Sequence, residues 1–148
     1  TRFEDEKVYL IKPQKFMNHS GHPIKQAIEF YKANPETDLL VISDDIRLPC
    51  GSKRMKSSGS AGGHNGLTDI LNHFGNDSWS RLRIGIDEPG QISQSDYVLG
   101  KFTPEQWELV EPTLEAATVA AKLWITHGPE LTMNSCNETG NTENARNQ

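Results

Sequence analysis

The chain has 148 residues, of which 34% are hydrophobic, and its formal net charge at pH 7 is −5. This length fits one domain with a single modest core. No apolar run approaches the roughly 18 residues needed to span a bilayer. No charged segment followed by an apolar one indicates a secretory signal, so we expect a soluble protein.

The acidic balance argues against binding nucleic acid over the whole surface, but the charges are unevenly distributed. Residues 46–68 contain no acid, and basic residues gather in and just after this stretch: Arg47, Lys53, Arg54, Lys56, Arg81 and Arg83. A local basic face suits a phosphate-bearing ligand, and ordinary surface scatter is the alternative. The two cysteines, Cys50 and Cys136, are expected to be free thiols in a reducing compartment.

In the first half of the chain, residues 8–11 form a β-prone run that predicts a strand. Apolar residues at helical spacing follow Ser20, which predicts a helix capped by Ser20 and stopped by Asn34 and Pro35. The continuous apolar run 39–42 predicts a strand covered on both faces. Residues 48–63, with a proline and four glycines, predict a long functional or mobile loop.

The second half begins with a predicted helix over 65–74, ended by Gly75. Alternation over 81–86 predicts a strand with one face buried, and residues 97–99 predict a short extended piece. Thr103 followed by Pro104 predicts a helix start. That helix should run to about Trp124 with a break at Pro112.

Residues 127–148 are polar and lack periodicity, which predicts a disordered tail. The domain is therefore expected over 1–126. Its alternating strands and helices predict an α/β fold of the three-layer sandwich type, with a mixed, largely parallel sheet flanked by helices.

Polar residues follow the predicted strands, where open α/β sheets bind ligands. Asn18 precedes a helix, Asp44 and Asp45 follow the apolar strand, and His64 and Asn65 stand where the glycine-rich loop enters a helix. A carboxylate there can orient a histidine, and asparagine can grip an amide and a carbonyl together. Turn and cap roles are the alternatives for each of them.

Two other patterns point to less specific chemistry. The segment from Gly59 to Gly66 suits a nest of backbone N–H groups or a flexible loop, and it matches neither a P-loop nor a dinucleotide fingerprint. His19 and His22 are three residues apart, but no third ligand completes a set, so we expect no metal.

Five segments resemble, in the same order, motifs of the peptidyl-tRNA hydrolase family. KPQKFMNHSG (12–21) resembles KPxTFMNxSG, and SDDIRLP (43–49) resembles HDELDLP. KSSGSAGGHNGL (56–67) resembles KxGGGxGGHNGL, SRLRIGI (80–86) resembles xRLRIGI, and YVLGKF (97–102) resembles FVLGxF. The resemblance implies hydrolysis of the ester between a peptide and the 3′ end of tRNA, with neither metal nor other cofactor.

The resemblance also implies roles for particular residues. Asp44 matches an aspartate that holds the general-base histidine, and Asn18 and Asn65 match asparagines that bind the peptide and position water. The remaining matches are a methionine of the peptide groove, a histidine beside the second asparagine, and two cations that contact tRNA phosphates: Met17, His64, Lys56 and Arg83.

Some family features differ here. The family segment GLGNPGxxYxxTRHNxG, which carries the base histidine, has no counterpart in these 148 residues. Ser43 stands in place of a histidine, and Arg47 in place of an acid. Because a general base contributes about 10²–10⁴-fold to a rate, we expect this chain alone to hydrolyse poorly.

Three hypotheses follow from these similarities and differences: an esterase on peptidyl-tRNA, a non-catalytic RNA-binding module of the same fold, and a truncated product without function. The resemblance implies the acceptor stem and 3′ end of peptidyl-tRNA as partner, with no membrane. We expect a monomer in the cytoplasm, with a mitochondrion or other organelle as the alternative.

Overall fold

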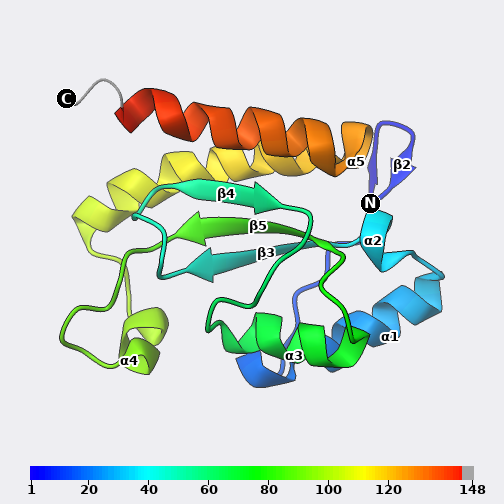
Figure 1. Ribbon diagram of the computed structural model, residues 1–148, viewed down its shortest axis with the longest axis horizontal. Coiled ribbons are helices and arrows are strands. Elements are labelled where there is room, and N and C mark those ends of the chain that lie inside the picture. The colour runs from blue at the N-terminus through cyan, green and yellow to red at the C-terminus, as the bar shows by residue number, and fades with distance from the viewer. Residues whose placement is uncertain (145–148) are drawn as a thin grey trace.

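The computed structural model describes residues 1–144, with side chains as far as residue 137. Its centre is a three-stranded mixed sheet with helices on both faces (Figure 1), which confirms the expected fold class. The central strand β5 (Ser80–Gly85) pairs parallel with β3 (Leu40–Asp45) and antiparallel with β4 (Lys53–Lys56). The carboxyl ends of β3 and β5 therefore meet at one end of the sheet.

Two apolar clusters hold the layers together. One lies between the sheet and the long helix α5 (Pro104–Asn144), and includes Met55, Leu82, Ile84, Ala117, Ala120 and Cys136. The other lies between the opposite face and the helices α1 (Gly21–Tyr31) and α3 (Asn65–Phe74), and includes Ile24, Leu67, Ile70 and Trp79. Burial of these side chains on both faces stabilises a three-layer arrangement.

The strand predicted at residues 8–11 is wrong. This stretch is irregular and Leu10 is 86% exposed, whereas a hairpin not predicted forms from β1 (Arg2–Phe3) and β2 (Glu6–Lys7). The prediction that β3 is covered on both faces is also wrong, because Ile42 is 54% exposed. Strand formation needs a hydrogen-bonding neighbour, and among the described residues β3 pairs only with β5.

Three further elements differ from the predictions. The long loop contains β4, whose single apolar residue Met55 is fully buried, and residues 94–99 form the helix α4 (Gln94–Leu99) instead of an extended piece. β5 is buried on both faces, since it lies between two strands and under helices on either side. The short helices η1 (Met17–His19) and α2 (Pro35–Asp38) complete the elements.

Helix α5 begins where the sequence predicts. Thr103 Oγ1 accepts from the N–H of Gln106 at 3.2 Å, and the Gln106 side chain accepts from the N–H of Thr103 at 2.9 Å. This is a reciprocal cap. The break predicted at Pro112 is wrong: the backbone leaves helical geometry only at Gly128, with φ 77°, where glycine tolerates a positive φ.

The tail predicted from residue 127 differs from the structure as well. After Gly128 the helix continues to Asn144, and Thr132 and Cys136 are buried against the sheet side of the molecule. Thr132 and Cys136 are four residues apart, which is helical spacing, but they stand in a run of mostly polar residues, so the composition concealed the pattern. Residues 145–148 of the predicted tail lie outside the described residues.

Asn137 joins this last helical segment to the sheet. Its side-chain oxygen accepts from the N–H of Met55 at 3.1 Å, and its amide nitrogen donates to the Met55 carbonyl at 3.2 Å. The side chain thus takes the place of a neighbouring strand's peptide at the outer edge of β4. Burying the backbone N–H and C=O groups of an edge strand without hydrogen-bond partners costs free energy, and Asn137 supplies those partners for Met55.

Replacing Asn137 with alanine is expected to lower the free energy of unfolding by about 1–3 kcal/mol, because two backbone groups lose their partners. Urea denaturation measures the change. Asn134→Ala is the matched control: Asn134 is exposed in the same helical segment, and its replacement should shift stability by at most about 0.5 kcal/mol. Equal effects at both positions would contradict the role given to Asn137.

Candidate active site

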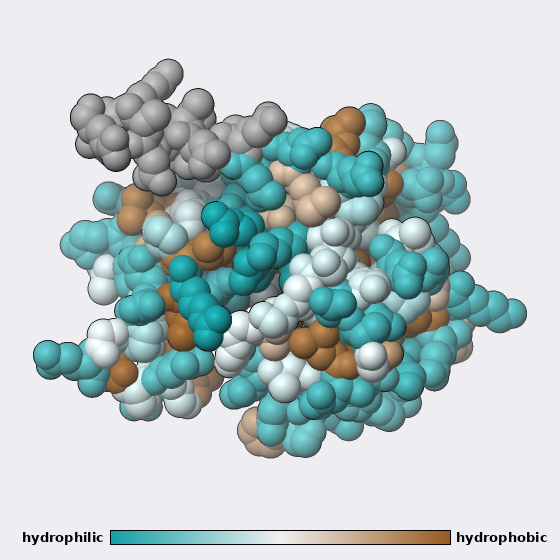
Figure 2. Space-filling view, viewed as in Figure 1, coloured by the Kyte–Doolittle hydropathy of each residue, from teal (hydrophilic) through white to brown (hydrophobic). Residues whose placement is uncertain are grey.

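A crevice of about 710 Å³ opens at the carboxyl ends of β3 and β5. It lies between η1, the start of α3 and α4, and Figure 2 shows the surface indented between the part that carries α4 and the part that carries α3. Residues that line it include Met17, Asn18, Asp44, Asp45, Gly62, Gly63, His64, Asn65, Arg83, Val98 and Leu99. Asn18, Asp44 and Asn65, predicted to meet around a single crevice, therefore do so.

Close packing of η1 against α3 places Met17 and Asn18. A β-carbon added at Gly66 would come within 2.6 Å of the Met17 sulfur, so glycine lets the Met17 side chain lie directly against the start of α3. The Ser20 hydroxyl donates to the Met17 carbonyl at 2.8 Å. Ser20 stands at the N-cap position of α1, as predicted, but its side chain makes no capping hydrogen bond there and stabilises η1 instead.

The start of α1 receives its cap from a distant residue. The N–H of Gly21 donates to Asp69 Oδ2 at 2.7 Å. A β-carbon at Gly21 would lie 2.5 Å from the Asp69 carbonyl oxygen. The two helices are thus in near backbone contact, and the segment before α1, including Asn18, is held at the crevice.

Asp44 and His64 form a hydrogen-bonded pair inside the crevice. His64 precedes α3 as its N-cap, and its Nδ1 accepts from the N–H of Leu67 at 3.2 Å. Nδ1 is therefore unprotonated and Nε2 carries the hydrogen, which it donates to Asp44 Oδ1 at 3.1 Å. In this arrangement neither ring nitrogen of His64 is left to accept a proton from water.

The pKa of the Asp44 carboxyl is lowered, first by the hydrogen bond from His64 and against the effect of burial. Asp44 is therefore a carboxylate at neutral pH. Its side chain is 37% exposed, and no side chain donates to its second oxygen, Oδ2, among the described residues. A low pKa makes it a poor proton acceptor but a good partner for a cationic or N–H-bearing group.

Asn18 and Asn65 present their amides to the crevice. Both residues are exposed, and within the described part of the chain no hydrogen bond of either side chain is recorded. Each amide offers two N–H donors and a carbonyl acceptor. The cap of α3 comes from His64, so both amides are left to contact a ligand in the crevice.

Arg83 lines the crevice, as expected, but its charge is compensated. Its Nη1 donates to Asp45 Oδ2 at 2.6 Å, and the two side chains are 14% and 8% exposed. Sequence reasoning missed this pair, because the partners lie far apart in the chain. The parallel register, which sets Ser43 beside Arg83 in neighbouring strands, brings them together.

Arg81, which sequence reasoning placed only in the basic group, anchors the glycine-rich loop. It is 1% exposed and its guanidinium lies 3.7 Å from the ring centre of Trp79. It donates to the carbonyls of Gly59, Ser60 (3.4 Å) and Asp77 (2.9 Å). Burial lowers the pKa of this guanidinium, which stays far above neutral pH, so a buried cation fixes the loop that leads to His64.

Lys56 lies elsewhere. It pairs with Arg81 at the start of β5, whereas the crevice lies at the opposite end of that strand. Any contact of Lys56 with a ligand thus requires a ligand that extends well beyond the crevice. Among the described residues no three histidine, cysteine or acidic side chains gather as a metal site would need, and neither Cys50 nor Cys136 is in a disulfide.

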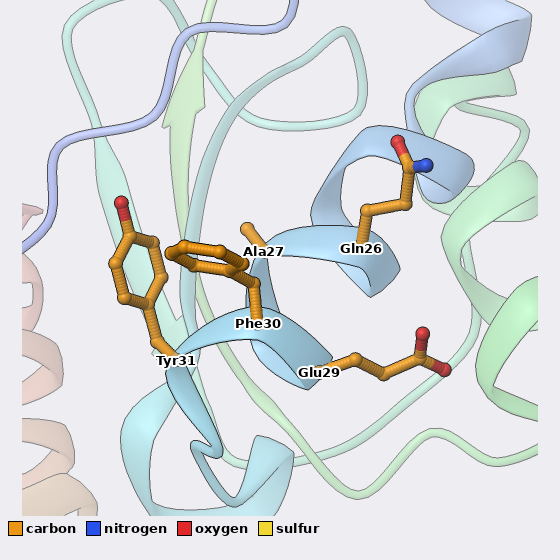
Figure 3. Close-up of a pocket in the computed structure, with 5 residues that line it drawn as sticks. All are labelled: Gln26, Ala27, Glu29, Phe30 and Tyr31. Carbon is orange, nitrogen blue, oxygen red and sulfur yellow. The ribbon is translucent and has the colours of Figure 1, made fainter.

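A second concavity lies on α1 (Figure 3), with Gln26, Ala27, Glu29, Phe30 and Tyr31 around it. The rings of Phe30 and Tyr31 meet edge to face at 5.0 Å. All of its residues come from one helix, and it offers a single carboxylate. It lacks the converging polar groups that a reaction site needs.

The fold and the crevice define an α/β protein with a carboxylate–histidine pair and free amides at the carboxyl end of its sheet. A family model described as peptidyl-tRNA hydrolase matches residues 1–145. The peptidyl-tRNA hydrolase of Rhodopirellula baltica is 44% identical over 142 residues, covering 95% of this chain and 74% of that protein. The chain belongs to the peptidyl-tRNA hydrolase family.

Further comparisons agree with this assignment. The peptidyl-tRNA hydrolase of Lactiplantibacillus plantarum is 44% identical over 126 residues, covering 84% of this chain and 68% of that protein. The crystal structure of peptidyl-tRNA hydrolase from Acinetobacter baumannii matches with a TM-score of 0.77 and 35% identity, covering 84% of this chain. The match spans 63% of that solved chain. None of the helices in the described part combines the length and apolar character that crossing a membrane requires.

Proposed function

We propose that this chain holds, for hydrolysis, the ester that links a peptide to the 3′ end of tRNA. The observation that carries the proposal is the meeting of Asn18, Asp44 and Asn65 in one crevice, although they are far apart in the chain. The membership of the family supports the same substrate. We also infer that it acts as a monomer in the cytoplasm, on the acceptor stem and 3′ end of its substrate.

The geometry suggests which residues bind each part of the substrate. The amides of Asn18 and Asn65 bind the peptide's N–H and C=O groups and orient a water molecule. Met17, 56% exposed at the rim, supplies apolar contact for the peptide. Arg83 holds Asp45 in place and Lys56 binds phosphates of the longer RNA stem. Binding energy from these groups fixes the ester where the attack occurs.

Removal of a proton from the attacking water needs a base that is stronger than Asp44. His64 does not serve, since both of its ring nitrogens are occupied. We propose that the base is a histidine that docks against Asp44 Oδ2, the oxygen that no side-chain donor contacts among the described residues. The resemblance implies such a histidine in a segment without a counterpart in these 148 residues.

The test compares two proteins: the chain of 148 residues, and the same chain joined to any residues that its gene encodes before Thr1. Both are incubated with peptidyl-tRNA, and the release of tRNA with a free 3′ end is measured. We expect faster hydrolysis, by about 10²–10⁴-fold, in the protein that contains the base. If both bind tRNA and neither hydrolyses the ester, an RNA-binding module is the correct function instead.

A further inference from the structure

The guanidinium of Arg47 lies at the rim of the crevice. A β-carbon added at Gly62 would lie 3.8 Å from its Nη1, and one added at Gly63 would lie 3.9 Å from its Nη2. Both glycines line the crevice and lead into α3. The exposed Arg47 side chain therefore extends across the glycine turn toward the site.

Asp45 holds the backbone of Arg47 in place beside the crevice. Its Oδ1 accepts from the backbone N–H of Arg47 at 2.8 Å, while its Oδ2 accepts from Arg83 Nη1 at 2.6 Å. The charge of Asp45 is thus compensated by Arg83. The guanidinium of Arg47 has no ion pair in the part of the chain that the structure describes, so its charge remains available to a ligand.

Two guanidiniums converge at this rim. The same β-carbon at Gly62 would lie 4.0 Å from Nη1 of Arg83. The crevice contains two carboxylates, Asp44 and Asp45, and with Arg47 present two guanidiniums balance them.

We propose that Arg47 binds a phosphate of the unpaired 3′ end of tRNA, next to the ester held in the crevice. This inference rests on the proposed function. A guanidinium binds phosphate oxygens through two parallel hydrogen bonds. Phosphates adjacent to a crevice-bound ester would reach the rim, where Arg47 lies. Arg47 stands where the family motif has an acid, so the inference is made for this chain and not for the family.

The experiment measures the Kd of uncharged tRNA over a series of salt concentrations, for the wild-type chain and for Arg47→Ala, Arg47→Lys and Arg2→Ala. Arg2 is the matched control, an exposed arginine in the β1–β2 hairpin, far from α4 and the crevice (Figure 1). We expect Arg47→Ala to raise Kd about fivefold at low salt and to flatten the log–log salt slope by about 0.7–1. Arg47→Lys should retain the slope, because its charge is kept.

A second RNA identifies where the contact is made. With tRNA trimmed of its unpaired 3′ nucleotides, wild type and Arg47→Ala should bind equally. If Arg47→Ala has the wild-type slope, or if it weakens the trimmed tRNA as much as the intact one, the inference is overturned while the proposed function stands. If the wild-type chain binds no tRNA at low salt, the proposed function and the inference both fall.

Discussion

Replacing Asp44 with asparagine is expected to lower the rate of peptidyl-tRNA hydrolysis by at least about tenfold in the protein that shows activity, since general-base assistance is worth about 10²–10⁴-fold. Asp44 is ionised at neutral pH because the hydrogen bond from His64 lowers its pKa. Asparagine keeps an oxygen that can accept from His64 Nε2, so the local geometry survives. It carries no negative charge to stabilise a protonated base.

Two measurements separate this role from a general loss of structure. Binding of tRNA by Asp44→Asn should equal or exceed that of wild type, because a negative charge near the phosphates has been removed. Asp38→Asn, at an exposed aspartate in α2, should leave the rate unchanged. A wild-type rate in Asp44→Asn would remove Asp44 from the reaction.

The sign of the pH effect follows from the lowered pKa of Asp44. The contribution of the Asp44 carboxylate to the stability of the fold is fully present at any pH above the ordinary carboxyl pKa. It is lost as the pH falls through the lowered pKa that Asp44 has in the folded state. The Asp44–His64 contact should therefore persist through neutral pH. The carboxylate contributes no change in rate between mildly acidic and neutral conditions, so any titration of the rate there belongs to another group.

Arg81→Met is expected to produce the largest loss of stability among the substitutions discussed, about 3 kcal/mol in the free energy of unfolding. Hydrogen bonds to a charged donor contribute about 1.5–3 kcal/mol each, and Arg81 makes several to carbonyls from two segments. Relief from burying an unpaired cation offsets part of this loss. The stacking with Trp79 is also weakened, by about 0.5–2 kcal/mol.

Urea denaturation measures this loss, and Arg54→Met is its control. Arg54 is exposed on the neighbouring strand β4, so its replacement should change stability by no more than about 0.5 kcal/mol. Arg81→Lys should be intermediate, since one ammonium cannot span carbonyls on both Gly59 and Asp77. Arg81→Met with wild-type stability would show that the loop is held by other contacts.

Local signals in the sequence identified much of the fold. The helix starts at Asn65 and Pro104 have caps that act within one turn, so neighbouring residues suffice to predict them. The start of α1 at Gly21 was also predicted, although its cap comes from the distant Asp69. β4 escaped prediction because it contains one apolar residue, Met55, in a polar run. The prediction for residues 8–11 was wrong in the opposite sense. These residues have the composition of a strand, but composition does not supply a neighbouring strand with which to form hydrogen bonds.

The sequence likewise predicted one part of the candidate site and missed another. Its chemical groups, Asn18, Asp44 and Asn65, were found from motifs and from their places after strands, and the structure brings them into one crevice. Two contacts that support the site were not predicted from the sequence. The Arg83–Asp45 pair depends on the register of two strands, and the Arg81 anchor depends on how a loop folds back over β5.

From sequence alone came the family, the α/β class and the residues that we propose carry the chemistry, since motif order and capping patterns are encoded locally. Only the tertiary structure decided which cations are neutralised and which remain free: Arg83 is paired with Asp45, Arg81 is buried among carbonyls, and Arg47 is exposed at the rim. Charge pairing depends on distances between residues that are remote in the chain, and no local pattern records those distances.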